Sequence, residues 1–446
     1  MSSPRRRASL VGMLLAALLV GASGIFSSPL RADEAAGDAD AAPTDIIKSG
    51  GADVGDVEIV QEVEQAAVEP TYGQPIATRM RVGARVEAKG GDVRNIFIMV
   101  AVPLDCPEQE VHVVEEDISP NVDSVEFRTL PEIKLAEPGA KQMLISIANL
   151  PPRQVASAIV TYEIVTKHVY APEETSTLKI PAKPPKQLKT YLSGSPYINV
   201  GDRKIKEAID DALAMRAKKD LAEPASASTE AADAASPGDT VEEIDDDPYE
   251  TVNADRSTEP AKAGNDRVAG RAASKVKAKE KPPTKEETKE EAKAIAAAIE
   301  KLSDWEQVEA LYDYAREKVK YLDGAEDMSS VQALKAEQAD CHGLSALFVA
   351  MCRTMKVPAR MVWVDGHQYA EFYLEDEAGK GYWYPAQLAG TRAFGEMPTP
   401  MVIFQKGDNF RVPERRRERL RYATDHTTLL SSAKHKPRVV YVREPL

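Results

Sequence analysis

The chain has 446 residues, enough for two or more domains. Its formal net charge of −14 argues against general nucleic-acid binding, which relies on clustered basic residues. Residues 1–32 have the pattern of a signal peptide, with arginines at positions 5–7, an apolar run over 10–20 and small residues up to Ala32. The apolar run is short for a membrane span, so we expect cleavage near Ala32 and an extracytoplasmic, periplasmic or secreted protein without stable membrane insertion.

The segment that follows has the pattern of a β-rich domain. Residues 33–56 are rich in Ala, Asp and Gly, which predicts a disordered leader. Over 57–200, apolar and polar residues alternate in short runs separated by turn clusters at 89–92 and 149–152. Seven or so strands of this kind fit an immunoglobulin-like β-sandwich that acts as a platform or a binding module. The alternating apolar positions are Met80, Val82, Ala84, Val86, Met143, Ile145, Ile147, Ala158, Val160, Tyr162 and Ile164.

Helices and a charged insertion come next. Residues 201–217 read as a helix. Residues 218–284 lack hydrophobic periodicity and consist of an acidic half followed by a basic half. We interpret 218–284 as a disordered insertion, either a solvated linker or an electrostatic tether for a partner. Helical spacing returns over 286–302, and Ser303 followed by Glu306 predicts a capping box that opens the next helix. Residues 285–425 thus predict an α+β domain, and 426–446 a polar C-terminal tail.

A third helix is predicted to begin at Cys341. Asp340 is a plausible N-cap, and the apolar stripe consists of Leu344, Leu347, Phe348, Met351 and Met355. A thiol at a helix N-terminus meets unsatisfied N–H groups and the positive end of the helix dipole, and both favour the nucleophilic thiolate. The alternative is that Cys341 is a small buried hydrophobe, as most free cysteines are.

The order of motifs after this helix resembles the transglutaminase-like superfamily of papain-like cysteine enzymes. Strands are predicted at 357–364, 366–374 and 382–387. The resemblance covers roughly residues 305–387, and the matching residues are Cys341, Pro358, Ala359, Arg360, His367, Tyr369, Glu371 and Trp383. It implies a transglutaminase-like (papain-like) domain with helices followed by an antiparallel sheet, here preceded by the β-sandwich. The chain departs from the family at Ala339, where a Gly is usual, and at Gln387, where the triad Asp is usual.

The resemblance also implies cysteine acyl-transfer chemistry on amide bonds of a protein or peptide. Cys341 would be the nucleophile. His367 would pair with the thiolate and protonate the leaving group, and Gln387 would hold the imidazole as an Asn does in papain-like enzymes. The backbone N–H of Cys341 is one expected oxyanion donor, and Tyr321 or Gln338 are candidates for the second. Water or an amine would resolve the thioester. The other hypothesis is a catalytically silent fold that binds a protein or peptide.

The remaining reactive side chains support no metal or cofactor site. Cys341 and Cys352 would lie roughly 16 Å apart on one helix, far beyond the ~7 Å between Cα atoms that a disulfide allows, and Cys106 lies in the other domain. We therefore expect a free Cys341. His342 reads as a local electrostatic influence on the thiol, and Cys341, His342 and His367 lack zinc-ligand spacing. Glu371 and Asp365 are alternative acids for the triad, and the oligomeric state is left open.

Overall fold

The computed structural model describes residues 68–130, 139–222, 285–415, 417–423, 425–432 and 436–446. All of them lie in one unit, Glu64–Leu446. The predicted signal peptide, the predicted leader and the charged insertion beyond residue 222 lie outside the described residues.

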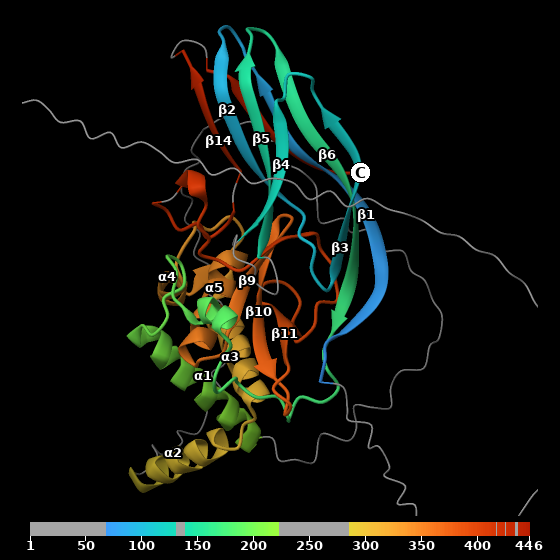
Figure 1. Ribbon diagram of the computed structural model, residues 1–446. Helices are drawn as coiled ribbons and strands as arrows, with labels where there is room; N and C mark the ends of the chain where they lie inside the picture. The colour runs from blue at the N-terminus through green and yellow to red at the C-terminus, as the bar shows by residue number, and fades with distance from the viewer. Residues whose placement is uncertain (1–67, 131–138, 223–284, 416, 424, 433–435) are drawn as a thin grey trace, which may run out of the picture. The chain divides into compact units, whose positions relative to one another are not determined.

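Two antiparallel sheets form most of the β structure (Figure 1). The smaller sheet has the order β15 (Arg438–Pro445), β1 (Thr71–Glu87), β6 (Val155–Tyr170) and β3 (Gln109–Ile118). The larger sheet runs through β12 (Ala393–Phe394), β11 (Gly381–Gln387), β10 (His367–Glu375), β9 (Ala359–Val364), β13 (Ile403–Lys406), β5 (Ala140–Leu150), β2 (Val93–Val102) and β14 (His426–Ser431). A further strand, β4 (Ser124–Leu130), also pairs with β5.

The predicted β-sandwich is confirmed, and its core is the predicted set of alternating residues. Strands β1 and β6 of the smaller sheet pack against β2 and β5 of the larger one through a shared apolar cluster. All the alternating apolar positions predicted above are buried in that cluster, from Met80 in β1 to Ile164 in β6. The period of two therefore places one face of each strand toward the opposite sheet.

The end of the chain departs from the expected polar tail. Residues 426–446 contain β14, which pairs with β2, and β15, which pairs with β1 from Met80 opposite Pro445 to Glu87 opposite Arg438. Val439 and Tyr441 pack against the sandwich core. Their β-branched and aromatic side chains suit a strand, and the alternation is short and flanked by charged residues.

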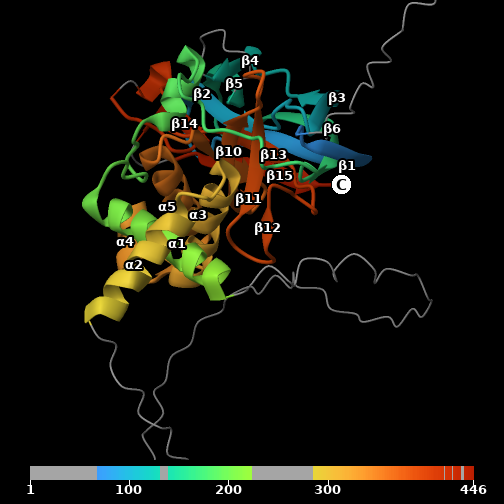
Figure 2. The ribbon, with the colours of Figure 1, turned by 90° about the horizontal axis from the view of Figure 1, so that it is seen from below.

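The helices gather beside β9, β10 and β11 (Figures 1 and 2). They are α1 (Arg203–Ala222), α2 (Lys285–Ile299), α3 (Asp304–Lys318), α4 (Ser330–Ala336) and α5 (Cys341–Thr354), with 3-10 turns η1 (Lys186–Leu192) and η2 (Pro413–Arg415). The capping box is present: Ser303 Oγ accepts from the Glu306 N–H at 3.3 Å, and a Glu306 carboxylate oxygen accepts from the Ser303 N–H at 2.8 Å. None of the described helices has the length and apolar character needed to cross a membrane.

Two β features complete this half. A two-stranded parallel sheet of β7 (Lys320–Tyr321) and β8 (Gln338–Ala339) leads directly into α5. Together with the helices and β9–β11, it gives the α+β domain that the sequence predicts. In the larger sheet β13 pairs with β9 on one side and with β5 on the other, so the strands of this domain and those of the sandwich form one continuous sheet.

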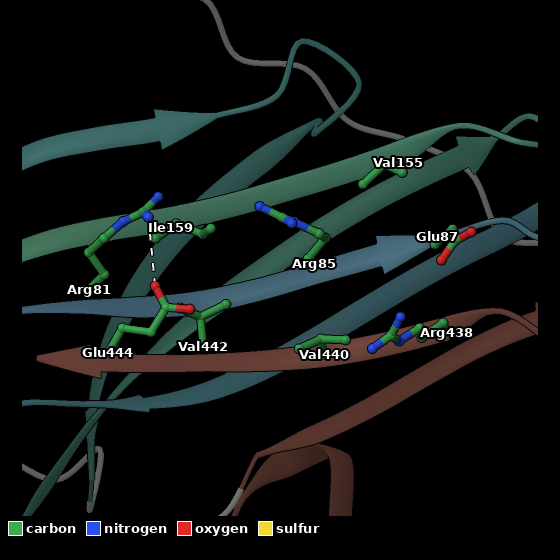
Figure 3. Close-up of a pocket in the computed structure, with 9 residues that line it drawn as sticks. All are labelled: Arg81, Arg85, Glu87, Val155, Ile159, Arg438, Val440, Val442 and Glu444. Atoms are coloured by element: carbon green, nitrogen blue, oxygen red, sulfur yellow. Dashed lines mark ion pairs between the residues drawn. The ribbon is translucent and has the colours of Figure 1, made fainter.

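The smaller sheet has a hollow of about 320 Å³ on its outer face (Figure 3). Gly83 lies between Val442 of β15 and Ile159 of β6. A side chain there would meet the Ala158 carbonyl oxygen at 2.1 Å, so this position requires glycine. Around it lie Arg81, which is paired with Glu444 at 3.7 Å, and Arg85 and Arg438.

Candidate active site

Cys341 is the first residue of α5, as predicted. The Asp340 side chain caps the helix by accepting from the Gly343 N–H at 2.8 Å. Gly343 is required by close packing, because a Cβ there would lie 2.7 Å from that of Ala339. The predicted stripe on α5 faces the core, with Leu344, Leu347, Phe348 and Met351 buried. The half-buried thiol is thus fixed at the junction of β8 and α5.

The ionisation of the thiol differs from the sequence-based expectation. Burial raises the pKa of Cys341 above its usual value, and the charge of Asp340 adds to the increase. Backbone N–H groups of Gln368, His342 and Cys341 act in the opposite direction but do not outweigh burial. The helix N-terminus therefore favours the thiolate as predicted, yet desolvation is the larger effect, and the resting form is the thiol.

His367 is the first residue of β10, and the predicted partner lies beside it. Its Nε2 is 3.0 Å from Oε1 of Gln387, the last residue of β11. Because an amide oxygen only accepts hydrogen bonds, Nε2 carries the proton in this contact, and Nδ1 is left as the basic nitrogen. Gln387 thus occupies the place of a residue that orients the imidazole.

Two side chains of α3 hold the backbone of Gln387 by hydrogen bonds. Its backbone carbonyl accepts hydrogen bonds from Tyr312 Oη at 2.7 Å and from Arg316 Nη1 at 3.2 Å. Arg316 also donates to the carbonyl of Leu388 at 2.9 Å and to that of Gly390 at 2.8 Å. These contacts fix the end of β11 and leave the Gln387 side chain directed to His367.

The polar contact of the thiol is Gln368, which the sequence analysis missed. Cys341 Sγ lies 3.5 Å from Gln368 Oε1, and Ser345 Oγ of α5 donates to the Gln368 carbonyl at 3.5 Å. Among the described contacts, no hydrogen bond joins Cys341 to His367 directly. The imidazole belongs to the residue next to Gln368, and consecutive Cα atoms are about 3.8 Å apart, so thiol and imidazole lie at the same end of β10.

Glu371 forms ion pairs away from His367 and does not replace the triad acid. It is buried and paired with Arg360 at 2.6 Å and with Lys406 at 2.9 Å. Burial alone would raise the pKa of Glu371, but the charges of Arg360 and Lys406 outweigh it and lower the pKa. The Arg360 guanidinium also lies 3.9 Å from the centre of the Trp383 ring. These three family-motif residues therefore form a structural cluster.

His342 is not an electrostatic influence on the thiol. It is 3% exposed, and its ring packs edge-on against Tyr197 at 5.1 Å and at a tilt against Trp363 at 5.6 Å. Burial and the nearby charge of Arg421 lower the pKa of His342 to about 4. The ring is therefore neutral at neutral pH, and its role is packing.

Among the described contacts, Tyr321, Gln338 and Asp365, the other candidates from the sequence, form no hydrogen bond with Cys341 or His367. The Tyr321 hydroxyl donates to Asp323 at 3.3 Å, and Tyr321 and Gln338 are both exposed on the small parallel sheet. Asp365 is exposed in the turn before β10. All three cysteines are free, and Cys352 is buried. Within the described ranges, no group of three or more His, Cys, Asp and Glu side chains is arranged to hold a metal ion.

Comparison with known proteins identifies the family of the segment that contains these residues. Residues 289–388 match the family model of the transglutaminase-like superfamily. A search of curated proteins found no match. One solved structure, a candidate cysteine protease from Cytophaga hutchinsonii, aligns over 84% of this chain and 93% of its own, with 12% identity and a TM-score of 0.39. The segment from 289 to 388, which includes Cys341, His367 and Gln387, is a transglutaminase-like domain.

Proposed function

We propose that this chain is a cysteine enzyme that transfers acyl groups from amide bonds of proteins or peptides, with Cys341 as nucleophile. The observation that carries the proposal is the 3.0 Å contact between His367 Nε2 and Gln387 Oε1, at the end of β10 where Gln368 contacts the thiol that begins α5. Orienting His367 through Nε2 leaves Nδ1 free to take a proton, as a cysteine–histidine pair requires.

The chemistry follows from these positions. His367 Nδ1 takes the proton of Cys341, and Sγ attacks the carbonyl carbon of the amide. The tetrahedral oxyanion collapses, the C–N bond breaks, and the leaving amine takes the proton from the imidazolium. Water or a second amine then attacks the thioester and restores the thiol. The first gives hydrolysis and the second transamidation.

We infer that the pair of Cys341 and His367 is completed on substrate binding. The thiol is protonated and contacts Gln368 rather than His367. Catalytic hydrogen bonds are often long or misaligned in free enzymes and tighten in the substrate complex. In the proposed reaction the Cys341 side chain leaves Gln368 and pairs with His367.

The same observations favour a second candidate function, a catalytically silent module that binds a protein or peptide. A raised thiol pKa, a neutral amide at the triad position and the missing hydrogen bond between Cys341 and His367 all fit it. The two functions differ in the reactivity of the sulfur.

A covalent probe separates the two functions. An enzyme should be acylated at Cys341 by p-nitrophenyl acetate, with a burst of p-nitrophenolate that Cys341→Ala abolishes while the melting temperature stays the same. Buried Cys352 provides the matched control, since Cys352→Ala should retain the burst. A wild-type protein without a burst, or a burst that survives in Cys341→Ala, would contradict the enzyme assignment.

We further propose that the protein acts outside the cytoplasm. The basic, apolar and small residues of positions 1–32 support export. Mass spectrometry of the protein from a cell-envelope or secreted fraction tests this, with a mature N-terminus at Asp33 as the expected result. An intact N-terminus in a cytoplasmic fraction would contradict it.

A further inference from the structure

We propose that the side-chain amide of Gln368 is the second oxyanion donor of the active site, beside the backbone N–H of Cys341. This inference rests on the proposed acyl-transfer function and assigns a catalytic role to a residue outside the Cys341, His367 and Gln387 set. It begins from the 3.5 Å contact between Cys341 Sγ and Gln368 Oε1.

The position of Gln368 on β10 explains how its side chain reaches the sulfur. Alternate residues of a strand lie on the same face, and Ala370, Phe372 and Leu374 belong to the core that α5 shares with β10. Gln368 continues that row at the end next to Cys341. It is the polar member of an otherwise apolar row, at the point where the row meets the thiol.

The amide of Gln368 can serve both the resting and the reacting site. At rest Oε1 accepts the S–H hydrogen, which suits a thiol whose pKa burial has raised. Among the described contacts Nε2 of Gln368 has no hydrogen-bond partner. Rotation about the terminal side-chain bond exchanges the positions of Oε1 and Nε2, which are nearly equal in shape. The amide then points an N–H at the sulfur and at the carbon that the sulfur attacks.

The oxyanion forms one bond beyond the carbon that is joined to Sγ. Donors must reach this oxygen at about 2.7–3.1 Å, and an amide already beside Sγ lies within that reach. The hydrogen bond neutralises part of the developing charge without forming or breaking a covalent bond at Gln368. It weakens again when the thioester forms and the C=O bond is restored.

The other candidate donors are less well placed. The Tyr321 hydroxyl already donates to Asp323 and is 51% exposed. Gln338 is exposed on β8. Among the described residues, Gln368 is the one whose side-chain amide contacts the sulfur.

The test compares acylation with alkylation in matched variants. Gln368→Met keeps the length of the side chain without a donor, and Gln368→Glu is isosteric and keeps an acceptor while losing the N–H. Gln338→Met tests the competing donor, and exposed Gln187→Met is a neutral control. The burst rate with p-nitrophenyl acetate reports oxyanion formation. Alkylation of Cys341 by iodoacetamide, followed by mass spectrometry across pH, forms no oxyanion and reports only the thiolate.

We expect Gln368→Met and Gln368→Glu to lower the acylation rate about 100- to 1,000-fold. Alkylation at high pH, where the thiol is ionised, should change less than about threefold in Gln368→Met. Acylation within about threefold of wild type in a folded Gln368→Met or Gln368→Glu variant, or a loss in Gln338→Met instead, would overturn the proposal. If the wild type is alkylated but not acylated, the proposed function fails, and the donor role fails with it because no oxyanion forms.

Discussion

The contact between His367 and Gln387 can be tested by weakening it and by strengthening it. Gln387→Ala removes the acceptor that lies 3.0 Å from Nε2. A neutral hydrogen bond contributes about 0.5–1.5 kcal/mol, which corresponds to an about 2- to 13-fold loss of acylation rate. The loss is partial because Cys341 and His367 remain. The backbone of Gln387 is held through its carbonyl by Tyr312 and Arg316, so β11 should keep its position.

Gln387→Glu is the opposite change. The side chain keeps its length and gains a negative charge beside the imidazole, and a carboxylate stabilises imidazolium as a neutral amide does not. The thiolate–imidazolium pair should become more populated, and the midpoint of the thiol titration should move down by on the order of one pH unit, or about tenfold in thiolate below the midpoint.

The assay is the rate of Cys341 alkylation across pH in the wild type, Gln387→Ala, Gln387→Glu and His367→Ala. We expect His367→Ala to lose acylation altogether and to leave a thiol that titrates at the highest pH of the set. If neither Gln387 variant changes the pH profile or the acylation rate, Gln387 does not orient His367. Exposed Asp365 then becomes the better candidate, since Glu371 is held by Arg360 and Lys406.

Three further predictions concern stability. Burial lowers the pKa of His342 from 6.5 to about 4, so its contribution is fully present above pH 6.5 and is lost as the pH falls toward 4. Urea unfolding should show a loss on the order of 3 kcal/mol over that range, and a non-titrating His342→Gln variant should show a flatter profile. Ser303→Ala should cost about 1 kcal/mol by removing the capping box of α3, and an unchanged urea midpoint would show that the cap adds nothing. Cys352→Ala should cost about 1 kcal/mol through a small cavity and leave Cys341 alkylation unchanged, whereas slower alkylation would show that the two sites are coupled.

Local patterns were sufficient to predict much of the fold. The alternation in β1, β5 and β6, the capping box at Ser303 and the start of α5 at Cys341 depend on residues within a few positions of one another. The pairings of β13, β14 and β15 are of a different kind. Each joins segments that are far apart in the sequence, and nothing within a short window indicates which strand will be the neighbour.

The site shows the same division. The order of His367 and Gln387 in the motif was sufficient to predict the contact between these two side chains. Gln368 was missed because the family motif names His367 and not the residue after it. Gln368 lies on the opposite face of β10, the face toward α5. The burial of His342 was missed as well, because its desolvation depends on Tyr197 and Trp363, which lie in segments that the motif does not contain.

The pairing of β1 with both β6 and β15 affects when the sandwich can fold during synthesis. A ribosome releases residues 71–87 long before residues 438–445, and until the later segment arrives β1 presents an open edge. Strand β2 likewise has an open edge until β14 has been synthesised. Unpaired edges of this kind invite pairing with other chains, and distant partners slow folding. The edges of β1 and β2 can therefore be paired only after nearly the whole chain has been made.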